Sequence, residues 1–317
     1  MPHFSSLNTI PSNHRQRTGT NAPNKEPRHD FRARPKSENL TNTLMSRRLF
    51  GLSLACSFAL PAPAMARARV LRDLAYGPAP RQTLDIYLPA APQNAPVLIM
   101  VHGGGWAIGD KSHKAVWREK QRHWGKKGWI FASVNYRMVP EANPLEQARD
   151  VARAIAYVQG NISGYNGDPT RIVVMGHSAG AHLVSLLAAD PGLAAREGAG
   201  RWRATVSLDT AAYDVENIMN SSPSRLYRNA FGADPILWRA TSPMARLEPG
   251  APDFLLVCST RRANACPAAR AFAMALTQVG TGALILPVDL SHGQVNSSLG
   301  RAGRYTTAVD RFLQPLI

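Results

Sequence analysis

The chain has 317 residues and 44% hydrophobic content, which supply enough apolar material for one large globular domain or two small ones. Its formal net charge of +16 is of the kind found in proteins that bind nucleic acids or membrane surfaces. Residues 1–66 contribute +6 of this charge through nine Lys/Arg and three Asp/Glu, and the rest is scattered without a basic run, which argues against a nucleic-acid-binding protein.

The first 44 residues are dominated by Asn, Pro, Arg, Ser and Thr and contain little apolar material. Such a segment cannot bury enough surface to offset the entropy lost when a chain is ordered. We therefore predict a disordered extension over residues 1–44. The start of the natural protein is either Met1 or Met45.

Residues 45–66 contain the three parts of a secretory signal peptide. Arg47 and Arg48 form a positive n-region, residues 52–60 form a short apolar run, and an Ala-Met-Ala cleavage site ends at Ala66. The arginine pair resembles a twin-arginine export signal, which predicts a periplasmic or secreted protein. The apolar run is too short to span a bilayer, so we expect no stable membrane insertion once the signal is removed.

Residues 67–317 alternate between strand-like and helix-like segments, which predicts a single α/β domain. We expect a mostly parallel central sheet with helices on both faces and a small cap. Strands are predicted at 83–88, 97–101, 129–135, 171–175, 204–208, 254–259 and 283–288, and helices at 144–158, 268–279 and 305–313.

A run of glycines follows the buried strand at 97–101, in the sequence His102-Gly103-Gly104-Gly105-Trp106. Successive glycines allow the backbone to fold inward and to direct N–H groups at a ligand without interference from side chains. Gly104 and Gly105 are the candidate donors to an oxyanion. The alternative is a flexible glycine turn with no function.

The strand at 171–175 leads into Gly176-His177-Ser178-Ala179-Gly180, the G-x-S-x-G pattern of a nucleophile elbow. A sharp strand-to-helix turn exposes the serine Oγ, and the flanking glycines keep that turn free of Cβ clashes. Ser178 is the candidate nucleophile. The N–H of Ala179 at the start of the helix is a third candidate oxyanion donor.

These two motifs occur together with three shorter ones, namely Gly109-Asp110-Lys111, Asn135-Tyr136-Arg137 and Gly167-Asp168-Pro169. The combination resembles the α/β-hydrolase superfamily, and within it the HGGGW carboxylesterases of the hormone-sensitive-lipase-like and BD-FAE-like group. The resemblance implies an exported serine hydrolase that cleaves small-molecule carboxylic esters through an acyl-enzyme intermediate. It implies no organic cofactor and no metal. Amide or formamide hydrolysis on the same fold is the alternative enzymatic reading.

The family places its catalytic histidine after the last strand, and His292 occupies that position. His292 would accept the Ser178 proton and later return it to the leaving group. The family's acid normally follows the strand at 254–259, but residues 260–267 contain no carboxylate. Asn264 stands near the expected position. We expect Asp209, at the end of the preceding strand, to replace the missing acid.

Because the usual acid is missing, a catalytically degenerate binding protein is an alternative. Asp289 lies only three residues before His292, too close in sequence to act easily as the acid. An insertion of about 210–252 contains four aromatic residues, Tyr213, Tyr227, Phe231 and Trp238. These rings either line a pocket beneath a small cap or pack the core of the cap itself. Two further features, the pairing of Cys258 with Cys266 and the oligomeric state, are left undecided by the sequence.

Overall fold

The computed structural model describes residues 68–316, so the extension and the signal peptide predicted over 1–66 lie outside the described residues. An eight-stranded sheet with the order β1-β2-β4-β3-β5-β6-β7-β8 forms the centre of this part of the chain. The predicted α/β fold class is confirmed. The strands are β1 (Arg69–Ala75), β2 (Thr83–Leu88), β3 (Ala95–Val101), β4 (Ile130–Val134), β5 (Gly167–His177), β6 (Ala204–Leu208), β7 (Asp253–Ser259) and β8 (Ala283–Val288).

Only the pairs that involve β2 are antiparallel, and the run from β4 through β3, β5, β6 and β7 to β8 is parallel throughout. Parallel neighbours end on the same edge of a sheet. The loops that follow β3, β5, β6, β7 and β8 therefore meet at one edge. That edge is where ligands bind in open α/β sheets.

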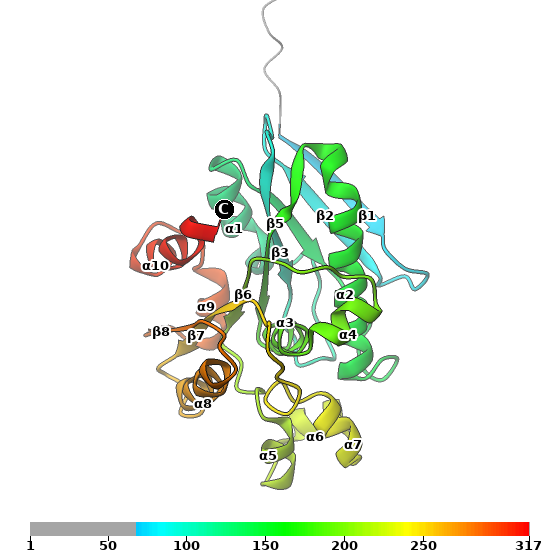
Figure 1. Cartoon of the computed structure of the whole chain (residues 1–317), viewed down its shortest axis with the longest axis vertical. Helices are drawn as coiled ribbons and strands as arrows, with labels where there is room; N and C mark the ends of the chain where they lie inside the picture. The colour runs from blue at the N-terminus through cyan, green and yellow to red at the C-terminus, as the bar shows by residue number, and fades with distance from the viewer. Residues whose placement is uncertain (1–67, 317) are drawn as a thin grey trace, which may run out of the picture. The chain divides into compact units, whose positions relative to one another are not determined.

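Helices pack on both faces of the sheet, and their bounds are α1 (Lys114–Lys126), α2 (Pro144–Asn161), α3 (Ala179–Ala189), α4 (Pro191–Arg196), α5 (Val215–Asn220), α6 (Arg225–Phe231), α7 (Pro235–Ala240), α8 (Ala265–Gln278), α9 (His292–Ser297) and α10 (Arg304–Leu313). Two short 3₁₀ helices lie at Ile162–Tyr165 and Gln314–Leu316. Figure 1 shows α2 on one side of the sheet, α1 and α10 on the other, and α5, α6 and α7 together near one end.

The alternation of side chains along β3 explains why both faces are apolar. Val97, Ile99 and Val101 belong to the hydrophobic cluster that α2, α3 and α8 cover. Leu98 and Met100 belong to the cluster that α1, α9 and α10 cover. Because successive side chains of a strand point to opposite faces, a strand covered on both sides is a continuous apolar run.

Helix α1 was not among the helices that the sequence predicts. Its inward face consists of Val116, Lys120 and Trp124, all of them buried. These positions have the i, i+4, i+8 spacing of a helix face, but the lysine in the middle interrupts the apolar pattern. The Nζ of Lys120 donates to Asn296 Oδ1 at 2.7 Å and to Asn296 O at 2.6 Å, which makes its burial possible.

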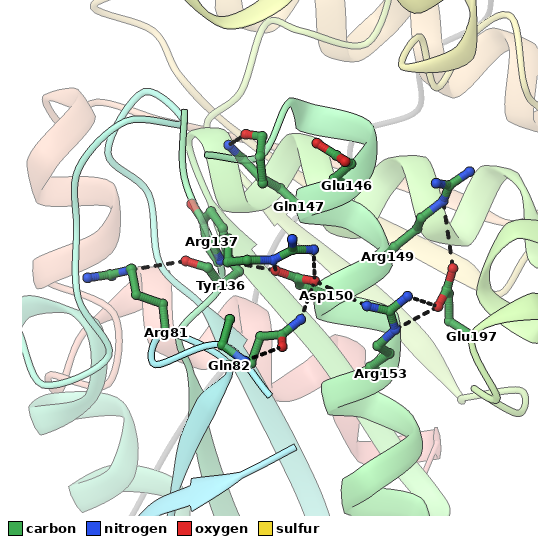
Figure 2. Close-up of polar contacts among 12 residues, drawn as sticks. Arg81, Gln82, Tyr136, Arg137, Glu146, Gln147, Arg149, Asp150, Arg153 and Glu197 are labelled. Atoms are coloured by element: carbon green, nitrogen blue, oxygen red, sulfur yellow. Dashed lines mark hydrogen bonds and ion pairs between the residues drawn. The ribbon is translucent and has the colours of Figure 1, made fainter. Parts of the chain in front are cut away.

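A buried carboxylate ties α2 to the loops around it (Figure 2). Asp150, fully buried, accepts two hydrogen bonds from the guanidinium of Arg137, at 2.8 and 2.7 Å. It also accepts one from Gln82 Nε2 at 2.7 Å. The Arg137 of the Asn135-Tyr136-Arg137 motif is therefore a structural residue that holds the loop after β4 against α2.

A disulfide joins Cys258, near the end of β7, to Cys266 in the first turn of α8, with the two Cα atoms 5.1 Å apart. It answers the pairing question that the sequence leaves open. The bridge encloses the loop in which the sequence pattern places the missing acid. Between residues 68 and 316, no helix combines the length and the hydropathy that crossing a bilayer requires.

We predict that Asp150→Asn lowers the free energy of unfolding by about 3 kcal/mol, because it removes the counter-charge of the partly buried Arg137. Urea unfolding followed by circular dichroism measures this loss. Asp289→Asn is the matched control, since Asp289 also pairs with an arginine (Arg261, at 2.7 Å) but is 79% exposed. The control should unfold close to wild type, and equal losses in both variants would contradict the assignment.

Candidate active site

The turn between β5 and α3 places Ser178 in a conformation that few residues adopt. Its φ is 55° and its ψ is −118°, and its N–H donates to Leu208 O at 2.9 Å. A Cβ at Gly176 would lie 2.3 Å from Gly180 O, and a Cβ at Gly180 would lie 2.4 Å from His102 O. The glycines on both sides of the serine are thus required by close backbone approach. The result is a strained strand-to-helix elbow in which Ser178 is partly exposed.

The glycine loop after β3 packs directly against this elbow. A Cβ at Gly103 would lie 2.9 Å from Ser178 Cβ, so the two backbones are in contact. Gly104 and Gly105 have φ values of 130° and 60°, which residues with a Cβ atom rarely adopt. Within residues 68–316, the N–H groups of Gly104, Gly105 and Ala179 donate no hydrogen bond. The three predicted donors are therefore free to bind an acceptor.

His292 begins α9 directly after Ser291, whose side chain caps the helix. The imidazole Nε2 lies 2.9 Å from Ser178 Oγ. Its Nδ1 lies 2.6 Å from Asp209 Oδ2. The structure therefore brings together the predicted serine, histidine and aspartate in one hydrogen-bonded chain. In this arrangement Nδ1 carries the proton, and Nε2 is free to accept the hydroxyl hydrogen of the serine.

Asp209 follows β6 and is fully buried, with a positive φ of 56°. Burial raises the pKa of its carboxyl, but hydrogen bonds from His292 and the Ser259 N–H, together with the charge of Arg262, outweigh that effect. The net result is a pKa below the usual value, and Asp209 is ionised at neutral pH. The Ser259 N–H donates to its Oδ1 at 2.8 Å, and Arg262 donates to its Oδ2 at 3.0 Å.

The two alternatives to Asp209, the amide of Asn264 and the carboxylate of Asp289, lie elsewhere. Asn264 is exposed at the start of α8 and lines a cavity under α5 and α6, and no hydrogen bond between described residues joins it to His292. Asp289 is 79% exposed and pairs with Arg261 at 2.7 Å. The geometry thus favours Asp209 over both.

Sequence reasoning missed two residues that contact His292. His177, the variable residue of the G-x-S-x-G pattern, donates from Nε2 to His292 O at 3.0 Å, and the two rings lie 4.6 Å apart. Burial, followed by the nearby charge of His292, lowers the pKa of His177 to about 3. Arg262 lies with its Nη1 3.3 Å from His292 Nδ1. The one sequence feature that indicates a role for His177 is its place between a predicted buried strand and Ser178.

The segment between β6 and β7 contains three short helices, α5, α6 and α7. Its aromatic residues divide between the two roles considered above. Phe231 is fully buried and packs on Trp106, with the ring centroids 4.9 Å apart. Tyr213 and Tyr227 line a cavity of about 530 Å³ with Asn264, although Tyr213 is itself buried. Leu226 of α6 lies directly over Gly105.

A buried histidine links this cap to the glycine loop. Trp106 Nε1 donates to His182 Nδ1 at 3.1 Å, and His182 Nε2 donates to Thr241 O at 2.7 Å. Burial lowers the pKa of His182 to about 4, so the ring is neutral at pH 7 and both of its nitrogens are satisfied. Within residues 68–316, no group of three His, Cys, Asp or Glu side chains is placed to hold a metal ion.

Comparison with known proteins connects this site to esterases. The BD-FAE family model matches residues 84–199, a span that contains both glycine motifs but ends before Asp209 and His292. The chain is 34% identical over 241 residues to the esterase LipQ of Mycobacterium tuberculosis, which covers 70% of this chain and 56% of that protein. It is 34% identical over 172 residues to a probable isoprenylcysteine alpha-carbonyl methylesterase of Oryza sativa, covering 51% and 40%. The chain thus spans about half the length of these relatives.

Solved structures share the fold. A truncated carbohydrate esterase from gut microbiota superposes with a TM-score of 0.68 at 20% identity, covering 80% of this chain and 98% of that one. An esterase from Thermogutta terrifontis gives a TM-score of 0.63 at 22% identity, covering 80% and 94%. At these identities the likeness establishes the arrangement of strands and helices.

The buried histidines predict how stability depends on pH. Burial is the largest cause of the low pKa of His102 (about 4), His177 (about 3) and His182 (about 4). All three titrate near 6.5 when unfolded, so below that pH the unfolded chain binds more protons than the folded one. Stability should therefore fall as pH drops from about 6.5 towards about 4, by up to about 4 kcal/mol per pH unit.

Urea unfolding at pH 7.0, 6.0 and 5.0 measures this slope. His182→Gln should reduce the slope by about a third, because one of three titrating groups is removed. His113→Gln is the matched control, since His113 is exposed. A stability that is constant between pH 7 and pH 5 would show that the three rings are not held neutral.

Proposed function

Because the chain belongs to the α/β-hydrolase carboxylesterase family, we propose that it hydrolyses carboxylic esters with Ser178 as nucleophile. The observation that carries the proposal is the continuous hydrogen-bonded chain from Ser178 Oγ through His292 to Asp209. This series of hydrogen bonds argues against a degenerate binding protein, because Asp209 supplies the carboxylate that is absent from the loop after β7.

The geometry defines the role of each group in the proposed reaction. Ser178 Oγ attacks the ester carbonyl carbon as its proton passes to His292 Nε2, 2.9 Å away. Asp209 stabilises the imidazolium through Nδ1–H. His292 then donates the proton to the departing alkoxide, which leaves as an alcohol, while the acyl group stays bonded to Ser178 Oγ. A water molecule gives a proton to His292 and attacks the acyl carbon; the bond to Oγ then breaks, the carboxylic acid leaves, and His292 returns the proton to Ser178.

Negative charge that develops on the carbonyl oxygen requires donors on the opposite side. We assign this role to the free N–H groups of Gly104, Gly105 and Ala179, which surround the elbow. Ala179 begins α3, so its N–H also carries the positive end of the helix dipole. Preorganised donors of this kind contribute about 3–4 kcal/mol each to the stabilisation of an oxyanion.

Small-molecule carboxylic esters are the proposed substrates, in line with the esterase names of the relatives. Leu226 is 50% exposed and Ile108 is 71% exposed, and both lie beside the glycine loop. They provide an apolar rim for the acyl or alcohol group. Amide hydrolysis is the second candidate, and the ratio of rates for an ester and its matched anilide distinguishes the two.

Export through the twin-arginine route is proposed from the Arg47 and Arg48 pair and the cleavage site at Ala66. The disulfide between Cys258 and Cys266 supports this proposal, because structural disulfides persist mainly in oxidising compartments.

We predict that Ser178→Ala abolishes turnover of an uncharged aryl ester and labelling by a fluorophosphonate. Asp209→Asn should lower turnover by about 10⁴-fold, because the amide cannot stabilise the imidazolium. Asn264→Asp should change the rate by less than about twofold, since Asn264 lies away from His292. Steady-state rates at a fixed pH measure all three.

Asp209→Asn and Asn264→Asp are controls for each other, because one replaces a carboxylate by an amide and the other makes the reverse replacement. If Asn264→Asp raised the rate sharply while Asp209→Asn had no effect, the assignment of the acid would be wrong. If Ser178→Ala kept full turnover, the serine-hydrolase proposal itself would fail.

We predict that the protein recovered from outside the cytoplasm begins near Arg67. Intact-mass spectrometry of that protein measures the cleavage position, and Arg47→Lys with Arg48→Lys should retain the chain in the cytoplasm in its uncleaved form. A full-length chain found only in the cytoplasm of wild-type cells would contradict export.

A further inference from the structure

The loop between β7 and α8, in which the family pattern places its acid, contains arginines and no carboxylate. Arg262 lies in this loop, which the Cys258–Cys266 disulfide closes. Its backbone is held at both ends, since its N–H donates to Ser259 O at 3.4 Å and its carbonyl accepts from Ala265 N at 3.3 Å. The loop is therefore short and braced, and it presents the guanidinium from a fixed base.

The guanidinium of Arg262 is directed at Asp209. Nη1 donates to Asp209 Oδ2 at 3.0 Å and to Asp209 O at 2.9 Å. Oδ2 is the same oxygen that accepts the 2.6 Å hydrogen bond from His292 Nδ1. Nη1 and Nδ1 are 3.3 Å apart, and since both are donors they share this acceptor and do not bond to each other.

This sharing has an electrostatic consequence. Asp209 places a negative charge beside the imidazole of His292, and the Arg262 guanidinium, 3.3 Å from the same ring, offsets that charge. Asp209 is fully buried and Arg262 is 28% exposed, so water screens the interaction only partly.

Other charged or titratable groups near His292 are already engaged. His177 donates to His292 O, Lys120 donates to Asn296, Tyr305 donates to Val295 O, and Asp289 pairs with Arg261. The first three hold the backbone or the side chains of α9 and its N-terminus, and the last is exposed. Within residues 68–316, Arg262 is thus the arginine or lysine that contacts the imidazole directly.

We propose that Arg262 is a positioning residue that shares the Asp209 carboxylate with His292, and that its positive charge offsets the negative charge of Asp209 at the imidazole. The proposal rests on the proposed function, since it concerns the base of that reaction. Asp209 and Arg262 then set the electrostatic environment of His292 together.

The test is the pH dependence of kcat/KM for phenyl acetate, an uncharged ester, between pH 4.5 and 9. The acid limb of that profile reports protonation of the base in the free enzyme. In Arg262→Met the midpoint of the acid limb should move up by about one pH unit, because the opposing charge is lost. Arg262→Lys retains the charge and should shift the midpoint by less than about 0.3 unit. A merely structural role would lower the plateau without moving the midpoint.

A second measurement keeps the proposal falsifiable if Arg262→Met does not fold. In the Asp209→Asn background the arginine faces the imidazole without a counter-charge, so adding Arg262→Gln should raise turnover by about tenfold. Thermal melts establish that each variant is folded. An unmoved acid limb in folded Arg262→Met, or no gain in the double variant, would overturn the role of Arg262. Wild type without Ser178-dependent turnover would instead overturn the proposed function, and with it this proposal.

Discussion

The hydrogen bond between Asp209 Oδ2 and His292 Nδ1 constrains the whole carboxyl edge of the sheet. Its partners are 83 residues apart in sequence, and a ring and a carboxylate meet at 2.6 Å only if β6, β7 and β8 are in register. Backbone hydrogen bonds between neighbouring strands continue past the strand ends and maintain this register. Ser178 N–H donates to Leu208 O, Asp209 N–H to Val257 O, and Thr260 N–H to Val288 O. Each functional loop therefore begins as a continuation of its strand, and a register shift would separate the three groups.

The sequence predicted what depends on local chemistry. The strands predicted at 83–88, 204–208 and 283–288 have the observed bounds, because each is a short segment rich in apolar and β-branched residues. Ser178 and the glycine loop were recognisable because each is defined by a few adjacent residues. Asp209 could be predicted only as the better of two alternatives, with Asn264 as the other, because its proximity to His292 depends on the order of the strands. Helix α1 was missed because Lys120 occupies its inward face, and its partner, Asn296, is 176 residues away.

The same lysine explains how a very short helix can hold the imidazole of His292 in place. Helix α9 has six residues, too few to be stable by itself. A capping box between Ser291 and Gln294 fixes its first turn, and Lys120 and Tyr305 donate to Asn296 O and Val295 O from the two helices packed against it. Burial lowers the pKa of Lys120 to about 7, but three acceptors satisfy its Nζ without a counter-ion. His292 is thus positioned by contacts that lie beneath it in the core.

The adjacency of β6 and β7 also explains how a carboxylate at the end of β6 can reach His292. Neighbouring parallel strands are about 4.8 Å apart, so a carboxylate at the end of either strand is within reach of an imidazole beyond β8. At the end of β6 the Asp209 carboxylate is buried, and its Oδ1 accepts from the Ser259 N–H of the neighbouring strand. The loop after β7 brings the Arg262 guanidinium to its Oδ2. The aspartate of the one loop and the arginine of the other are therefore a complementary pair of charges, and the buried carboxylate is compensated by hydrogen bonds from both sides.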